Sequence, residues 1–231
     1  MRVLITGSNR GIGLEYVRQL LARGEHVFAM CRNPDSAQEL QVLRDQYTSQ
    51  LVIIKLDVTD PTSVNTAYDE VSAQVDSLDL IINNAGIDLG AETLGNIQKT
   101  NFMRAFEVNV VGVMLVSQRF VHLLKCGDNP RLVNIGSGAG SMTEGAPAGL
   151  YSYNASKAGL NMLTTMLHRD LQTSGIITIV LNPGWVITDM GGANAKLQPE
   201  DSVRQQLQVI DGLTIDDSGV FKNYDGGEIA W

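Results

Sequence analysis

The chain has 231 residues, of which 44% are hydrophobic, and it carries a formal net charge of −8 at pH 7. A chain of this length buries enough surface for one α/β unit, so we expect a single domain over residues 1–231. The negative charge disfavours binding to nucleic-acid phosphates, and no uninterrupted apolar run approaches the roughly 20 residues that span a bilayer. We therefore expect neither a nucleic-acid partner nor a membrane.

The N-terminus and the cysteines bear on the cellular compartment. An apolar strand is predicted to begin at residue 2, with no leader before it, so we expect a cytoplasmic protein. Cys31 and Cys126 are isolated and belong to no cluster of metal-ligand residues. We therefore expect reduced thiols, no disulfide and no metal site.

The first predicted element is a short apolar strand at residues 3–5 that leads directly into a glycine-rich turn at residues 6–13. A helical pattern follows, and Gly24 stands where a left-handed helix cap is expected before a second strand at 26–31. In such a unit the glycines let the backbone approach a pyrophosphate closely, and the helix N-terminus attracts the anion. The turn predicts a dinucleotide site, with an ordinary strand-to-helix turn as the alternative.

Strand and helix patterns alternate along the rest of the chain. Strands are predicted at residues 51–56, 78–82, 131–135 and 176–181, and helices at 35–46, 62–75, 103–125 and 151–174. Alternation is typical of right-handed crossovers in a parallel sheet, so we expect an α/β fold, a doubly wound Rossmann sheet with helices on both faces. Loops near 86–100, 138–150 and 185–198 each follow a strand, which gathers them at the carboxyl edge of the sheet.

Tyr153 and Lys157 are four residues apart in a predicted helix, so their side chains share one face. A free tyrosine has a pKa near roughly 10 and transfers protons poorly at neutral pH unless a nearby positive charge favours the phenolate. An ammonium group one turn away supplies that charge. The spacing predicts that Lys157 lowers the pKa of Tyr153.

Seven sequence features, in this order, resemble the short-chain dehydrogenase/reductase family. They are Thr6-Gly7-x-x-x-Gly11-Ile12-Gly13, Asp57-Val58, Asn83-Asn84-Ala85-Gly86, Asn109, Ser137, the Tyr153/Lys157 pair and Pro183-Gly184-x-x-x-Thr188. The closing segment 221–226 with Trp231 looks most like the branch of C-factor and sniffer-type carbonyl reductases. The resemblance implies a Rossmann enzyme that uses NAD(H) or NADP(H).

The resemblance also implies catalytic roles for four residues. Tyr153 would be the general acid in carbonyl reduction, and Lys157 would bind the nicotinamide ribose and tune Tyr153. Ser137 would donate a hydrogen bond to the substrate oxygen as charge develops there. Asn109 resembles the asparagine that holds a water next to the lysine, although a buried asparagine satisfied by backbone groups is the alternative.

The family pattern places the cofactor on eighteen residues. They are Gly7, Asn9, Arg10, Gly11, Ile12, Gly13, Arg32, Asp57, Val58, Asn84, Ala85, Gly86, Tyr153, Lys157, Pro183, Gly184, Val186 and Thr188.

The end of the second predicted strand decides between NAD and NADP. An acidic side chain there would bind the ribose 2′-hydroxyl of NAD and repel a 2′-phosphate. This chain has Arg32 at that position and Arg10 in the glycine turn, beside a helix N-terminus that disfavours positive charge unless an anion is present. The two arginines predict a preference for NADPH over NADH, with solvated surface arginines as the alternative.

The substrate is less well determined than the cofactor. Leu89, Met142, Leu150, Trp185 and Met190 lie in or beside the three loops and predict an apolar pocket for a carbonyl or alcohol substrate, such as an aldehyde, ketone or quinone. The segment 185–198 is a candidate lid. The long helices at 103–125 and 151–174 resemble those that pair in family members, so a homodimer is expected.

Three classes of function fit these patterns. The first is an NADPH-dependent carbonyl reductase, which the complete set of four catalytic candidates favours. The second is a signalling or regulatory protein that binds NAD(P) with little or no turnover, because a fold alone does not establish catalysis. The third, an epimerase or dehydratase, is disfavoured because only about 40 residues follow Thr188, too few for a substrate domain.

We expect Arg32→Asp to shift the cofactor preference from NADPH toward NADH, because a carboxylate would repel the 2′-phosphate and accept a hydrogen bond from the 2′-hydroxyl. The measurement is kcat/KM for both cofactors in the wild type and the variant. Unchanged selectivity would count against Arg32 as a phosphate ligand.

Overall fold

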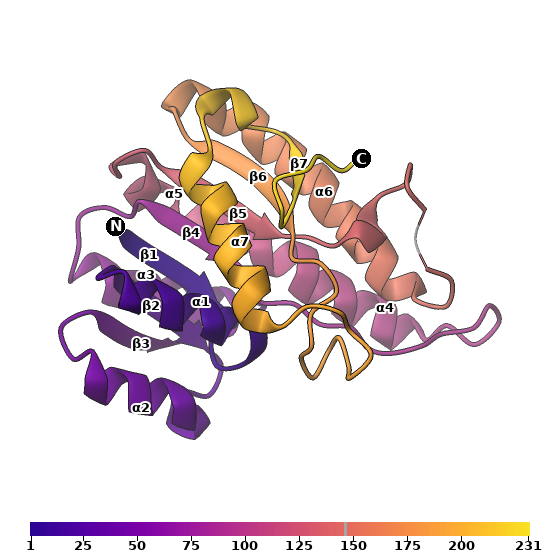
Figure 1. The fold of residues 1–231 in the computed structure, drawn as a ribbon, viewed down its shortest axis with the longest axis horizontal. Coiled ribbons are helices and arrows are strands. Elements are labelled where there is room, and N and C mark those ends of the chain that lie inside the picture. Colours follow the sequence, from indigo (N-terminus) through magenta and orange to yellow (C-terminus); the bar gives the residue numbers. More distant parts are fainter. Residues whose placement is uncertain (146) are drawn as a thin grey trace.

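The computed structural model describes residues 1–145 and 147–231 (Figure 1). Within these residues the strands are β1 (Arg2–Thr6), β2 (His26–Cys31), β3 (Leu51–Lys55), β4 (Leu80–Asn83), β5 (Arg131–Ile135), β6 (Ile177–Asn182) and β7 (Phe221–Asn223). The α-helices are α1 (Gly11–Ala22), α2 (Gln38–Gln46), α3 (Pro61–Ser72), α4 (Lys99–Phe106), α5 (Gly112–Lys125), α6 (Tyr151–Leu171) and α7 (Pro199–Gly212).

All of these strands form one parallel sheet in the order β3-β2-β1-β4-β5-β6-β7. The chain winds outward in one direction from β1 to β3 and in the other direction from β4 to β7, so β1 and β4 are neighbours at the point where the winding reverses. Ligands of open parallel sheets bind outside the carboxyl ends of the strands at this point. The predicted α/β Rossmann fold with helices on both faces is confirmed.

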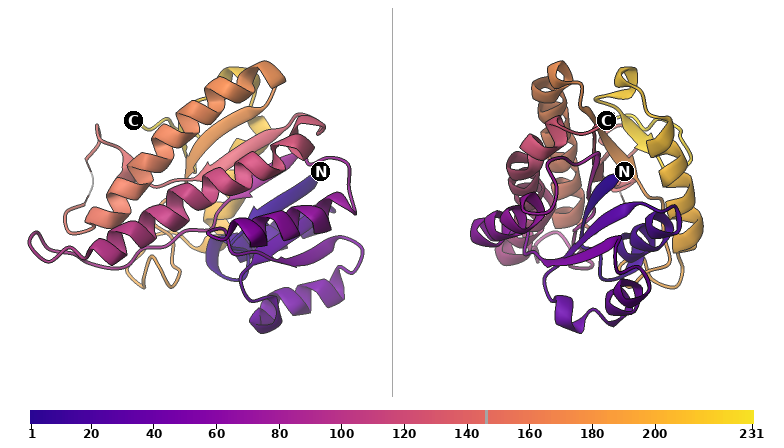
Figure 2. Two further views of the ribbon diagram at one scale, coloured as in Figure 1. Left: turned by 180° about the vertical axis from the view of Figure 1, so that it is seen from behind. Right: turned by 90° about the vertical axis from the view of Figure 1, so that its left-hand side faces the viewer.

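The sheet lies between two helical layers, as the right-hand view of Figure 2 shows, with α7 (yellow) in one layer and α5 (magenta) in the other. Successive side chains of a strand point to opposite faces. In β1, Val3 and Ile5 pack with apolar residues of α1, α2 and α7, whereas Leu4 packs with those of α3 and α5. Both faces are apolar, which explains why the strands are continuous hydrophobic runs.

The part of the chain after residue 198 departs from the sequence prediction. Helix α7 and the edge strand β7 were not predicted, although α7 carries the usual signals: Pro199 at the first helical position, two acidic residues after it, and Val203, Leu207 and Ile210 at helical spacing. Strand β7 has only three residues, which is too short for a periodic pattern.

The long helix predicted at 103–125 also differs, since it begins at Lys99 and is interrupted by a π-helical turn at Glu107–Val111. The whole run Lys99–Lys125 is long and apolar enough to cross a membrane by length and composition alone. Half of its most apolar stretch is buried in the fold, where Phe120 and Leu124 pack against the sheet. Packing in the core accounts for its hydrophobicity.

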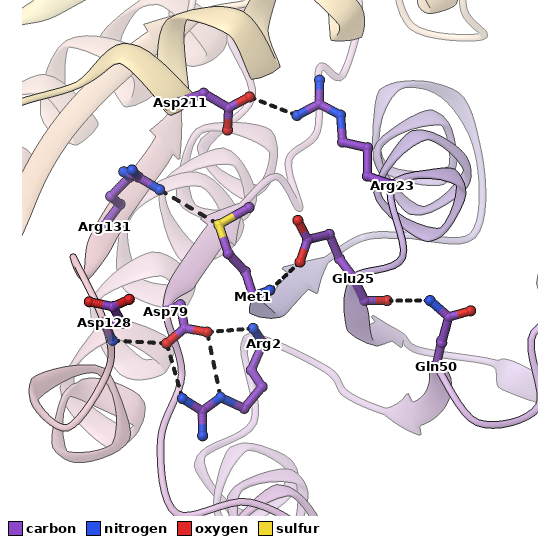
Figure 3. Close-up of polar contacts among 9 residues, drawn as sticks. All are labelled: Met1, Arg2, Arg23, Glu25, Gln50, Asp79, Asp128, Arg131 and Asp211. Carbon is purple, nitrogen blue, oxygen red and sulfur yellow. Dashed lines mark hydrogen bonds and ion pairs between the residues drawn. The ribbon is translucent and has the colours of Figure 1, made fainter.

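A buried carboxylate, Asp79, joins the amino ends of neighbouring strands (Figure 3). It accepts hydrogen bonds from the backbone N–H groups of Arg2, at 2.6 Å, and Asp128, at 2.9 Å, and it pairs with the Arg2 guanidinium. Burial acts to raise the pKa of Asp79, but the hydrogen bonds and the charge of Arg2 outweigh it and leave the pKa below its usual value. The ionised form is therefore stabilised by folding.

We expect Asp79→Asn to lower the free energy of unfolding at pH 7 by about 1–3 kcal/mol, because an amide N–H would face a donor. A carboxyl whose pKa is depressed by folding adds stability above its unfolded pKa of about 3.9, and this stability is lost as the pH falls through the folded pKa. The difference between wild type and variant in urea unfolding should therefore shrink below about pH 4.

Asp128→Asn is the matched control, because Asp128 takes part through its backbone N–H and its side chain is exposed. It should leave the stability at pH 7 unchanged. An Asp79→Asn variant as stable as this control at pH 7 would contradict the role given to the Asp79 carboxylate.

Candidate active site

The glycine turn is fastened to the end of β4 by the side chain of Asn84. The Asn84 amide donates to the carbonyl oxygens of Thr6, at 2.9 Å, and Gly7, at 3.0 Å. In return, Thr6 Oγ1 accepts hydrogen bonds from the backbone N–H groups of Asn84 and Ala85. These bonds fix the two strand ends at the point where the winding of the sheet reverses.

Two glycines of the turn are required by close packing. A Cβ at Gly7, whose φ is +65°, would lie 2.8 Å from the Cα of Ala85. A Cβ at Gly13 would lie 2.2 Å from the Gly7 carbonyl oxygen and 2.5 Å from Asn84 Nδ2. The turn therefore presents bare backbone at the start of α1, as a pyrophosphate site requires.

A cavity of about 520 Å³ opens beside this turn. Most of the predicted cofactor residues line it: Gly7, Asn9, Arg10, Gly11, Ile12, Gly13, Arg32, Asp57, Val58, Asn84, Ala85, Gly86, Tyr153, Lys157, Pro183 and Thr188. Gly184 and Val186 do not, and Val186 is a buried residue of the 185–198 loop that pairs with Leu197 of the same loop. Asn109 and Ser137 do not line the cavity either, but Asn109 is hydrogen-bonded to Ile87 and Ser137 is near Tyr153, and both Ile87 and Tyr153 line it.

Tyr153 lies in the first turn of α6, and Ser137, two residues after the end of β5, is near enough to influence its phenol. Burial raises the pKa of Tyr153, the Ser137 hydroxyl opposes this, and the charge of Asp88 raises it further. The net pKa is above its usual value, so the predicted lowering by Lys157 is wrong for this structure. The Lys157 Nζ is 5.8 Å from the centre of the Tyr153 ring, and desolvation of the phenolate dominates.

Lys157 is buried one turn further along α6, and its Nζ donates to the Ile135 carbonyl at 2.8 Å. Burial lowers the pKa of this ammonium to about 8. A titratable group with a pKa this close to neutrality, in the wall of a cavity, is typical of functional sites.

Asn109 is buried in the π-helical turn between α4 and α5, a kind of turn that is frequent at functional sites. Its side chain accepts from the backbone N–H of Ile87 at 2.8 Å, and it donates to the Ile87 carbonyl and to Ser156 Oγ. The side chain thus holds the start of the 86–100 loop against α6. A role in binding water stays a prediction.

A buried chain of polar side chains sets α6 against the sheet. Asn83 Nδ2 at the end of β4 donates to Asn134 Oδ1 at 2.9 Å, and Asn134 Nδ2 donates to Thr164 Oγ1 of α6, also at 2.9 Å. All three residues are buried, so the partners fix each other's position. Because these bonds hold α6 against the sheet, they also set the positions of Lys157 and Tyr153 on that helix.

Basic residues gather at the end of the cavity next to β2. Arg32 lies near Asp57, whose carboxyl accepts from the backbone N–H and hydroxyl of Thr59. Burial acts to raise the pKa of Asp57, but these hydrogen bonds and the charges of Arg32 and Arg104 lower it overall. Asp57 is therefore ionised at neutral pH and faces the positive Arg32.

The sequence prediction left out the acidic partners of the arginines at this end of the cavity. Arg10 pairs with Asp189 of the 185–198 loop at 3.1 Å, and both side chains are largely exposed. Arg18 of α1 pairs with Glu39 of α2, and both line the cavity. Such exposed pairs are worth little and exchange readily. Nothing in the sequence pattern indicates either pair, because each joins residues from separate elements.

The apolar residues predicted for the substrate pocket surround the cavity unevenly. Met190 lines it, whereas Leu89, Met142 and Trp185 are exposed on the three loops and are not part of its wall. Asp88 and Glu92 of the 86–100 loop were not predicted as site residues. Asp88 influences Tyr153 through its charge, and Glu92 contacts the start of α6.

With this geometry in place, comparison with known proteins settles the family. Residues 1–198 match the model of the short chain dehydrogenase family. The chain belongs to this family. Its members are oxidoreductases that use nicotinamide cofactors, in keeping with a glycine turn that opens onto the Tyr153 and Lys157 cavity.

Two curated proteins show how far the similarity of this short chain dehydrogenase extends. The C-signal of Myxococcus xanthus is 40% identical over 154 residues, which cover 67% of this chain and 93% of that protein. An uncharacterized oxidoreductase of Schizosaccharomyces pombe is 36% identical and covers 98% of this chain and 96% of its own length.

Two solved structures resemble this short chain dehydrogenase over its whole length. The NADPH-bound carbonyl reductase from chicken fatty liver has a TM-score of 0.93 and 39% identity, and the alignment covers 100% of this chain and 98% of that one. The carbonyl reductase Sniffer of D. melanogaster has a TM-score of 0.95 and 30% identity, with coverage of 100% and 99%. The predicted resemblance to the carbonyl reductase and C-factor branch is confirmed.

We expect Gly13→Ala to lower the free energy of unfolding by about 1–3 kcal/mol, because the new methyl group would overlap the Gly7 carbonyl. The turn must open to relieve this contact, so dinucleotide affinity should fall about tenfold or more, equivalent to about 1.4 kcal/mol. Thermal unfolding and NADPH titration by fluorescence measure the two effects.

Gly212→Ala at the end of α7 is the control, because a Cβ there meets nothing within 4 Å. It should leave dinucleotide affinity unchanged. Equal NADPH affinity in the Gly13→Ala variant and the control would show that the glycine turn does not contact the cofactor.

Proposed function

We propose that this protein is an NADPH-dependent carbonyl reductase that converts an aldehyde, ketone or quinone to an alcohol. The observation that carries the proposal is that Tyr153, Ser137 and Lys157 converge beside the cavity that the glycine turn opens. A bound nicotinamide supplies the hydride, and the protein supplies position, a proton and charge stabilisation.

Tyr153 suits the role of general acid in reduction. Burial keeps its pKa above the usual value, so the phenol is protonated at neutral pH but is a weak acid on its own. It can donate a proton to a developing alkoxide where a nearby positive charge stabilises the phenolate that remains. The Ser137 hydroxyl lies near enough to the Tyr153 phenol to affect its pKa, so in this proposal one carbonyl oxygen accepts hydrogen bonds from both. The same phenol, once deprotonated, would act as base in alcohol oxidation.

Lys157 stabilises the charge that Tyr153 acquires. With a pKa of about 8 the Lys157 side chain is mainly an ammonium at pH 7, and it lies on the same face of α6 as Tyr153. A phenolate formed by proton transfer is attracted to this ammonium in a poorly solvated site. In this proposal the same group also binds the ribose of the cofactor.

The preference for NADPH rests on the basic end of the cavity. Arg32 lines the cavity where β2 ends, and Arg10 lies in the glycine turn. A 2′-phosphate would compete with Asp189 for Arg10, since an exposed ion pair is weak and a doubly charged phosphate is the stronger partner. The NADPH-bound chicken carbonyl reductase, which shares the fold, supports this choice.

A second candidate function is signalling with bound NAD(P) and little turnover. One observation favours it, the 40% identity to a protein named C-signal. The intact set of Asn109, Ser137, Tyr153 and Lys157 speaks for catalysis instead. The homodimer and the cytoplasmic location stay predictions.

We expect Tyr153→Phe to lower kcat for carbonyl reduction by about 10²-fold or more, since the general acid is lost, while NADPH affinity stays within about twofold. The measurement is NADPH oxidation with a panel of hydrophobic aldehydes, ketones and quinones. Tyr151→Phe, which removes the exposed hydroxyl two residues earlier, should retain full activity.

If Tyr153→Phe retained turnover, this result would contradict the proposal that Tyr153 is the general acid. A wild-type protein that binds NADPH but reduces none of these carbonyls would favour the signalling alternative.

A further inference from the structure

Helix α6 carries the proposed catalytic pair but has no cap of its own. Its N-cap residue, Leu150, makes no side-chain hydrogen bond, and its first turn contains no acidic residue. The first N–H groups of a helix lack partners within the helix and must find them elsewhere. A cap matters for the site because Tyr153 lies within this first turn.

Glu92 supplies the missing cap from a loop that lies about 60 positions earlier in the chain. One carboxylate oxygen accepts from the backbone N–H of Ser152 at 2.7 Å, and the other accepts from Ser152 Oγ at 2.5 Å. Glu92 is 8% exposed, so its charge is held away from water. A carboxylate in this place is stabilised by the helix dipole and by two charge-assisted hydrogen bonds.

The backbone of Glu92 adds a third hydrogen bond to the two made by its carboxylate, and we call this set of three bonds the Glu92 clamp. Its N–H donates to the Gly149 carbonyl at 2.7 Å, just before α6 begins. The 86–100 loop and the 138–150 loop are thereby joined at the start of the helix, at the end of the molecule where α4 begins in Figure 1. Two of the three hydrogen bonds of Glu92 hold Ser152, which immediately precedes Tyr153, and the third holds Gly149.

The Glu92 clamp also holds the loop that carries one of the groups acting on the Tyr153 hydroxyl. Ser137, just after β5, and Lys157 of α6 lie beside Tyr153, and the charge of Asp88, four residues before Glu92 in the 86–100 loop, also acts on it. Release of Glu92 would free both the first turn of α6 and the loop that carries Asp88. A displacement of about 1 Å at a reacting group costs about 10²-fold in rate.

We propose that Glu92 is a positioning residue of the reductase: its carboxylate holds the first turn of α6 so that the Tyr153 hydroxyl stays aligned with Ser137. This inference rests on the proposed function for its effect on turnover. The effect of Glu92 on the start of α6 can be measured without any turnover. The positioning role and the proposed reductase function can therefore be refuted independently.

Two variants separate the hydrogen bonds from the charge. Glu92→Ala removes both side-chain bonds, whereas Glu92→Gln can retain both, since the amide oxygen accepts from the Ser152 N–H and the amide nitrogen donates to Ser152 Oγ. Glu144→Ala, which removes an exposed carboxylate from the neighbouring loop, is the matched control. Each is compared with the wild type at equal extent of folding, checked by circular dichroism.

The first readout is hydrogen exchange of the backbone amides at residues 151–155. We expect faster exchange in Glu92→Ala, protection restored in Glu92→Gln, and no change in Glu144→Ala. Unchanged exchange in Glu92→Ala would overturn the proposal, because the cap would then be dispensable.

The second readout is kinetic. We expect kcat for carbonyl reduction to fall about tenfold or more in Glu92→Ala and to recover largely in Glu92→Gln, with KM for NADPH within about twofold throughout. If Glu92 had a merely structural role, Glu92→Ala would lower the folded fraction and the stability. It would not lower kcat at constant KM for NADPH, and Glu92→Gln would not restore kcat. Lost protection with unchanged kcat would overturn the positioning role.

The third readout needs no substrate. Titration of the Tyr153 phenol is followed by tyrosinate absorbance, as the difference between each protein and its Tyr153→Phe counterpart. We expect its midpoint to shift in Glu92→Ala and to return in Glu92→Gln. If the wild type reduces no carbonyl, the proposed function fails, and this midpoint still decides the positioning role: a shift supports it and an unchanged midpoint overturns it.

Discussion

The arrangement of the site depends on one buried hydrogen bond, from the Lys157 ammonium to the Ile135 carbonyl. An ammonium group leaves water only when it gains a strong partner, and this carbonyl lies at the carboxyl end of a central strand. The bond ties α6 to β5 at the level where the cavity opens. It also leaves a cation with a pKa of about 8 beside Tyr153, close enough to neutrality to respond to a neighbouring charge.

Around this contact, hydrogen bonds of polar side chains position the segments of the site, and the apolar core holds the helices on the sheet. Asn84 secures the glycine turn, Asn134 connects the sheet to α6 through Thr164, and Asn109 attaches the 86–100 loop to the π-helical turn. The Asn134 and Asn109 amides each accept and donate, so each connects two segments, whereas the Asn84 amide donates to two carbonyls of the glycine turn. Asparagine suits the end of a parallel strand, where backbone groups lose their partners in the sheet.

The site is built from segments that are distant in sequence, and their charges constrain one another. Burial favours a neutral Tyr153, whereas a phenolate would be favoured by Lys157. Asp88 acts against the phenolate, and the Ser137 hydroxyl acts for it. The balance lies with the neutral phenol, which is the form that a proton donor needs. At the other end of the cavity, Asp189 pairs with Arg10 and Glu39 pairs with Arg18, which offsets the positive charge there.

Features that depend on residues close together in the chain could be predicted from the sequence. The glycine turn before α1, the alternation of strands and helices, and the shared face of Tyr153 and Lys157 all follow from local backbone geometry. Helix α7 had the same local signals and could also have been found, whereas the three-residue β7 could not. The tertiary structure alone decided the direction of the Tyr153 pKa, the partner of Arg10 and the cap on α6. Each of these depends on desolvation or on a contact across many residues, and neither leaves a periodic trace in the sequence.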